Sequence, residues 1–154
     1  LLGSAALKQF SRFARLLAAL ALALAAQSAA AVCSIGVPGV AFGAYDPRSP
    51  SATDGAGTLT FTGCTAAYTI TLSQGSSNSY APRKMAAGLY RLDYNLYIDT
   101  GRNTVWGDGT AGTSIVSVSG APDGAAQTVY GRIPAAQNLG AGSYSDQVIV
   151  TVTF

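Results

Sequence analysis

The chain has 154 residues, of which only 10% are charged, and it contains 18 Gly but no His. Its seven acidic residues are all Asp and Lys occurs only twice, so two strong helix formers are nearly missing and a helical protein is excluded. The missing His also excludes catalysis by Ser-His-Asp or Cys-His groups within the chain, together with His-based metal sites.

Residues 1–31 carry the pattern of a secretory signal peptide. A positive flank precedes an apolar stretch of 11 residues, Leu16–Ala26, and an Ala-rich cleavage site that ends at Ala31. A membrane-spanning helix needs about 20 apolar residues, so this stretch is too short to cross a bilayer. We expect cleavage after Ala31 and a mature domain over residues 32–154. The flank consists of Lys8, Arg12 and Arg15, and alternative cleavage sites are Ala29 and Ala30.

Removal of this segment changes the charge of the protein. The mature part keeps six cationic side chains against seven Asp, a net charge of −1, so the pI of about 8.7 belongs to the uncleaved chain. Its cations are scattered, with Arg83-Lys84 as the one adjacent pair. We therefore expect no nucleic-acid partner.

Two cysteines, Cys33 and Cys64, remain in the mature chain. An even number in an exported protein indicates a disulfide. This bond would close a loop of about 31 residues, worth about 3–4 kcal/mol in the chain-entropy model. The alternative is a metal-binding pair, but two thiols without His do not complete a zinc site.

From residue 32 onward, short alternating runs are separated by turn signals such as Asp54-Gly55 and Asp123-Gly124. Six to eight strands at this spacing predict an antiparallel β-sandwich. The Ser-rich stretch Arg48–Gly55 is interpreted as an exposed loop. The expected strands are 59–62, 68–72, 89–98, 115–118, 128–133 and 148–154.

The last of these runs places four apolar side chains on one face. A long apolar strand at a sheet edge is an aggregation hazard, so something normally covers it. The strand is either buried inside the sandwich or borders a groove that a partner's strand fills. The four residues are Val148, Val150, Val152 and Phe154.

Three arrangements of Asp suggest chemistry, but each has a simpler interpretation. Asp99-Thr100-Gly101 resembles the turn of aspartic proteases, yet Arg102 follows where those enzymes have a small residue, so we interpret it as a hairpin turn. Asp99, Asn103 and Asp108 lack the spacing and the Glu of a calcium loop. Glycoside hydrolysis would need two suitably placed carboxylates, yet nearly all the Asp stand in turn-like contexts. Asp93 is the exception, and it is expected to pair with a cation across strands. We expect no catalytic residue, no metal and no cofactor.

The aromatic residues favour strands and suit a sandwich core. A role in carbohydrate or surface binding is the alternative for any one of them. We expect Tyr68, Tyr90, Tyr94 and Trp106 inside, and Tyr45, Tyr80 and Tyr97 at the surface.

Several motifs stand in a fixed order between Cys33 and Phe154. Together they resemble the spore coat protein U (SCPU) domain family, which is shared with subunits of archaic chaperone–usher (Csu-type) pili. The motifs are Val40–Asp46, Gly63-Cys64-Thr65, Leu89–Tyr97, Val105–Thr110, Val129–Pro134 and Gly142–Asp146.

This resemblance implies an immunoglobulin-like pilin domain that lacks its final strand. A periplasmic chaperone would lend a strand, an outer-membrane usher would export the subunit, and a neighbouring pilin subunit would replace the chaperone. The strand from Val148 to Phe154 would then border the groove. The protein would pass through the periplasm to a surface fibre or an extracellular coat.

One departure from the pilin pattern concerns the donor segment. Only Val32 lies between the expected cleavage site and Cys33, where a polymerising pilin has roughly ten or more alternating residues. We therefore expect a structural subunit that accepts a strand without donating one, as at the tip of a fibre. The alternatives are an adhesive tip module and a self-complete coat protein.

Overall fold

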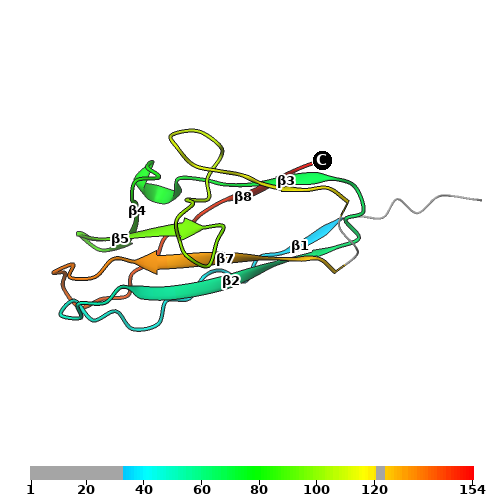
Figure 1. Cartoon of the computed structure of the whole chain (residues 1–154). Coiled ribbons are helices and arrows are strands. Elements are labelled where there is room, and N and C mark those ends of the chain that lie inside the picture. The colour runs from blue at the N-terminus through cyan, green and yellow to red at the C-terminus, as the bar shows by residue number, and fades with distance from the viewer. Residues whose placement is uncertain (1–32, 121–123) are drawn as a thin grey trace, which may run out of the picture. The chain divides into compact units, whose positions relative to one another are not determined.

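The structure, a computed structural model, describes residues 33–120 and 124–154, so the expected signal peptide lies outside the described residues. These residues form eight strands and one short 3-10 helix, without an α-helix (Figure 1). None of their elements is a helix able to span a membrane. The elements are β1 (Ser34–Gly36), β2 (Thr53–Thr62), β3 (Tyr68–Leu72), η1 (Gly75–Ser77), β4 (Arg83–Ala87), β5 (Tyr90–Tyr97), β6 (Val116–Val118), β7 (Ala126–Ile133) and β8 (Val150–Thr153).

Two sheets face each other and confirm the predicted β-sandwich. The larger sheet has the order β1-β2-β7-β5-β4 and the smaller has the order β6-β3-β8. Every pairing between these strands is antiparallel. Successive side chains therefore alternate between the core and the outside along each strand.

The core is built from the inward faces of both sheets. Leu59 and Phe61 of β2 are buried, whereas Thr58, Thr60 and Thr62 between and beside them are exposed. The same alternation holds in β3 and along β7 from Thr128, and in β5 it is interrupted by Asn95, which is also buried. Further buried apolar side chains are Tyr68, Ile70, Leu72, Met85, Leu92, Tyr94, Leu96, Trp106, Val129 and Ile133.

The predicted loop Arg48–Gly55 is wrong at its C-terminal end, where the last three residues form the start of β2. Thr53–Gly55 belong to β2 because this strand pairs with β7 from Thr60 back to Thr53, which lies opposite Ile133. Beside that pair, Asp54 accepts hydrogen bonds of 2.7 and 2.9 Å from Arg132. The cross-strand ion pair extends the ladder into a segment whose composition resembles a loop.

Two aromatic predictions are wrong. Tyr90 is half-exposed because the tight turn at Gly88 and Leu89 places it at the tip of the β4–β5 hairpin. Tyr80 is buried, and its hydroxyl donates to the Leu72 carbonyl at 2.9 Å. The expected core positions of Tyr68, Tyr94 and Trp106 are confirmed.

Candidate functional site

An apolar groove of about 880 Å³ opens between two segments of the chain. Residues 37–45 form one wall, and residues 139–150 form the other. The floor consists of core side chains that are only 2–7% exposed, so the groove reaches down to the hydrophobic core. Floor residues are Leu59, Leu72, Met85, Leu92, Tyr94, Leu96, Val129 and Ile133.

The first wall lies close against the sheet because glycines leave room for it. Ala41 pairs with Ala56 of β2, and the ring of Phe42 lies over Gly131 of β7. A β-carbon added at Gly131 would lie 2.9 Å from Cγ1 of Val40 and closer still to the Phe42 ring. Glycine is therefore required at this point of β7 for the wall to pack as it does.

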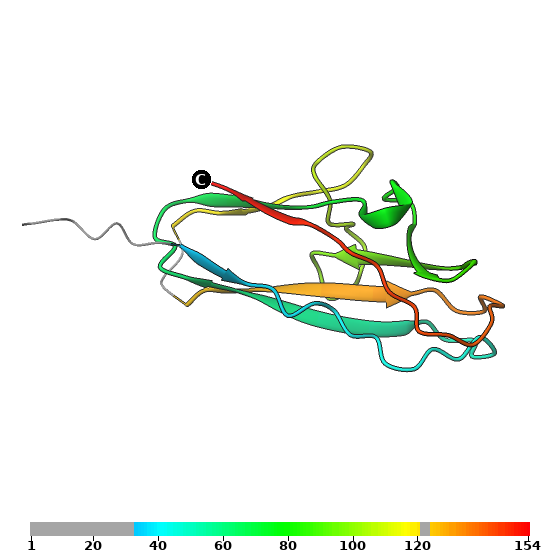
Figure 2. The ribbon, with the colours of Figure 1, turned by 180° about the vertical axis from the view of Figure 1, so that it is seen from behind.

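The second wall crosses from one sheet to the other. Ser145 exchanges two backbone hydrogen bonds, of 2.8 and 3.1 Å, with Ala86 of β4 in the larger sheet. A few residues later the same segment becomes β8 and pairs with β3 in the smaller sheet. Figure 2 shows this red segment rising from the layer of β7 toward β3.

The side chains of this wall alternate between the core and the outside. Val148, Val150 and Val152 are partly buried and pack against the core, whereas Ile149 between them is 64% exposed. Val148 and Val150 line the groove, and Val152 packs beyond it. Phe154 is also 64% exposed, and its ring centroid lies 5.9 Å from that of Tyr68.

The backbone of the second wall has an open edge. The Ser73 N–H donates to the Ile149 carbonyl at 3.0 Å, so Ile149 faces the smaller sheet at the position where the β3–β8 ladder begins. Because backbone groups alternate sides along an antiparallel strand, the N–H and C=O of Val150 and Val152 point away from β3. These groups lie along the edge that borders the groove.

Asp146 anchors the crossing segment. Its Oδ1 accepts hydrogen bonds from the Ser76 N–H at 2.9 Å and the Ser76 hydroxyl at 2.6 Å, and its Oδ2 accepts one from the Tyr94 hydroxyl at 2.6 Å. Burial would raise the pKa of Asp146, but the hydrogen bonds from Ser76 and Tyr94 outweigh it and hold that pKa below its usual value. Burial and the bond to Asp146 raise the pKa of Tyr94.

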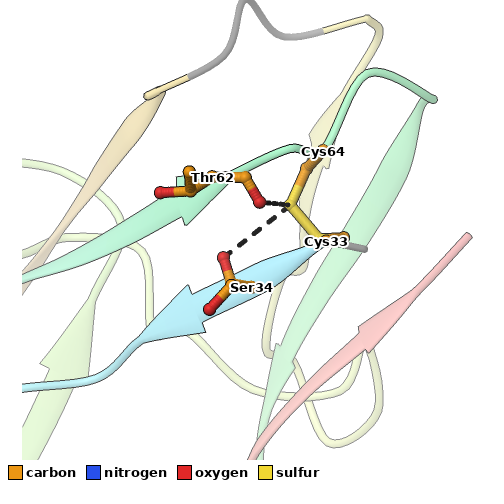
Figure 3. The surroundings of a disulfide bond; sticks show 4 residues. All are labelled: Cys33, Ser34, Thr62 and Cys64. Carbon is orange, nitrogen blue, oxygen red and sulfur yellow. Dashed lines mark hydrogen bonds between the residues drawn. A yellow bond between two sulfur atoms is a disulfide. The ribbon is translucent and has the colours of Figure 1, made fainter. Parts of the chain in front are cut away.

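The disulfide holds the start of the first wall. Cys33 and Cys64 are bonded, with Cα atoms 4.5 Å apart, as the sequence predicts. The Cys64 sulfur lies 3.6 Å from the Thr62 carbonyl oxygen and 3.9 Å from that of Ser34 (Figure 3). Because a bridged sulfur carries no proton, these are polar contacts. The bond ties the residue before β1 to the residues that follow β2.

The Asp residues considered for chemistry have structural roles. Asp99 caps a turn by accepting hydrogen bonds from the backbone of Asn103 and Thr104. Asp108 accepts two from Thr110 in its own loop. Asp93 forms the expected cross-strand pair, with Lys84 at 2.5 Å. The described residues hold no group of three side chains suited to a metal ion.

Comparisons with known proteins agree with this architecture. The sequence profile of the Spore Coat Protein U domain matches residues 19–151. Protein U of Myxococcus xanthus is 39% identical over 129 residues, which cover 73% of this chain and 70% of that protein.

A solved structure resembles the fold at a TM-score of 0.53 and 22% identity. It is a chaperone–tip adhesion subunit pre-assembly complex, CsuC–CsuE, from the archaic chaperone–usher Csu pili of Acinetobacter baumannii. The likeness covers 80% of this chain but 40% of the matched one. The profile match and the pilin-like fold indicate a structural protein and not an enzyme, and the chain belongs to the Spore Coat Protein U domain family.

Proposed function

We propose that this protein is an exported structural subunit of a bacterial surface fibre and that it accepts a β-strand from a partner. The observation that carries this proposal is the apolar groove beside an open strand edge. A strand laid there would pair with the backbone of Val150 and Val152 and place its own apolar side chains on the core. Completion of the sandwich would remove both the exposed edge and the wet groove.

The strand would come first from a periplasmic chaperone and then from a neighbouring subunit, with an usher as the exporter. The likeness to a subunit of a chaperone complex supports this order of partners. With cleavage after Ala31, only Val32 precedes the disulfide-bonded Cys33, which leaves no length for a donor strand. The protein would therefore stand at a fibre tip.

A strand appended to the C-terminus tests this proposal. An alternating apolar peptide joined after Phe154 by a flexible turn can fold back antiparallel to β8. We expect a higher melting temperature and a monomeric product, because a few hundred Å² of covered apolar surface is worth several kcal/mol at about 25 cal/mol per Å². The control carries a peptide of the same composition in which the apolar residues do not alternate. An unmodified chain that is already stable, and that neither peptide changes, would identify a self-complete coat domain.

A second candidate function, adhesion by the tip, is supported by Leu89. This side chain is 98% exposed at a hairpin turn, where polar residues and glycine usually stand. We expect Leu89→Ser to lower retention of the protein on a hydrophobic surface several-fold without a change in melting temperature. Ile115→Ser, at a less exposed apolar residue, is the matched control. Equal retention of both variants and the parent protein would dismiss this function.

A further inference from the structure

The second wall carries one charge on its inward face. The side chains that alternate inward there are Tyr144, Asp146, Val148 and Val150. Among the described residues that line the groove, Asp146 is the single charged one. An otherwise apolar groove therefore contains a carboxylate at a defined position along its edge.

The two oxygens of this carboxylate are engaged to different extents. Oδ1 accepts three hydrogen bonds, two from Ser76 and one from the Gln147 N–H, whereas Oδ2 accepts one, from Tyr94. A carboxylate oxygen has two lone pairs, so Oδ2 can accept another donor.

Arg83, the one buried cation among the described residues, interacts electrostatically with Asp146 but bonds to other acceptors. Arg83 has no exposed surface, and its guanidinium donates to the Ser73 and Trp106 carbonyls and to Asn95. These contacts hold its guanidinium in the core. Among the described residues no ion pair includes Asp146, whose carboxylate lines the groove.

We propose that the strand accepted by this groove carries a basic side chain, Lys or Arg, opposite Asp146. The inference rests on the proposed function and adds the chemistry of the partner. Side chains on the same face of paired strands lie with Cβ atoms about 4.5–5.5 Å apart, within reach of an ion pair. An apolar side chain at that position would cover the carboxylate of Asp146 without supplying an opposite charge, and an acidic one would be repelled. One position of the donor strand is thereby selected by charge.

Synthetic peptides test the inference by direct binding to the cleaved, disulfide-bonded protein. An alternating apolar peptide is varied at each inward position in turn as Lys, Met or Glu. At the peptide position that lies opposite Asp146, we expect the Lys peptide to bind about tenfold more tightly than the Glu peptide, with the Met peptide between them. The difference should shrink as salt is raised, since the pair is partly exposed.

Two variants separate the charge from the anchoring contacts. Asp146→Asn should reduce the preference for the Lys peptide over the Glu peptide to about twofold or less. Ser76→Ala removes a hydrogen bond to Oδ1 but leaves the charge, so the preference for the Lys peptide should remain. If the Lys and Glu peptides bind the parent protein equally well, whichever inward peptide position is varied, the inference alone is overturned. Failure of every peptide, the all-apolar one included, would overturn the proposed function with it.

Discussion

The guanidinium of Arg83 lies in the interior of the sandwich, where its hydrogen bonds join three segments of the chain. It donates to the Ser73 carbonyl, to the Asn95 side chain at 2.8 Å and to the Trp106 carbonyl at 2.7 Å, and it lies 4.9 Å from the centre of the Tyr80 ring. Burial lowers the pKa of Arg83. Because the planar fork satisfies several acceptors at once, this residue holds the loop that contains Trp106 over the end of the core.

We expect Arg83→Lys to lower the free energy of unfolding by about 2–4 kcal/mol, because an ammonium cannot reach the same acceptors and leaves buried carbonyls without donors. The measurement is urea denaturation of the protein with an appended strand. The control is Arg91→Lys, at an exposed residue of β5, which should change stability by about 0.5 kcal/mol or less. Equal stability of the two variants would contradict the assigned role of Arg83.

The sequence predicts few of these single-residue environments. Alternation places Tyr68 and Tyr94 in the core correctly, because each lies within a regular strand. Tyr80 and Arg83 follow a short 3-10 helix, and their burial depends on a loop that arrives from more than twenty residues later. No local pattern contains that information.

At the scale of elements, two glycines that lie opposite each other in β2 and β7 determine how the first wall packs. Gly55 and Gly131 are register partners in β2 and β7, and both lie under Phe42. The ring of Phe42 also meets Tyr94 edge to face, with centroids 5.9 Å apart. The first wall can therefore pack against β2 and β7 only because Gly55 and Gly131 have no side chains where Phe42 lies.

We expect Gly131→Ala to lower stability by about 1–3 kcal/mol, because the added β-carbon meets Val40 and Phe42 in a packed region. It should also weaken binding of a donor strand, since the first wall must move. Ala126→Val, at an exposed position of the same strand, is the control and should have little effect. Denaturation curves of the two variants measure the difference, and equal curves would mean that the wall does not need the glycine.

The strands themselves are largely predictable, and the path of the last segment is not. Period-two alternation identifies β3, β5 and β8, most of β7 and the last part of β2, because one face of each strand packs on the core. It misses β1 and β4, which are short and contain few β-branched residues. The change of sheet between Ser145 and Val150 follows from two distant partners, β4 and β3, and leaves no mark in the alternation of the segment.

At the scale of the whole described domain, the sandwich has a core with an open side. The disulfide holds the start of the first wall, Asp146 anchors the second, and the groove between them is lined by buried core residues such as Leu92 and Val129. A strand laid in the groove would bury further apolar surface, which stabilises the fold by about 25 cal/mol per Å². Under the proposed function, a partner's strand completes the sandwich and becomes part of the fold.

Amide hydrogen exchange along the last strand tests this account most directly. The chain with an alternating strand after Phe154 is compared with one whose appended strand contains prolines that cannot pair. We expect the amides of Val150 and Val152 to exchange roughly 100-fold more slowly in the first protein, while those of Thr151 and Thr153, whose backbone groups face β3, are protected in both. Equal protection of Val150 and Val152 in the two proteins would contradict it.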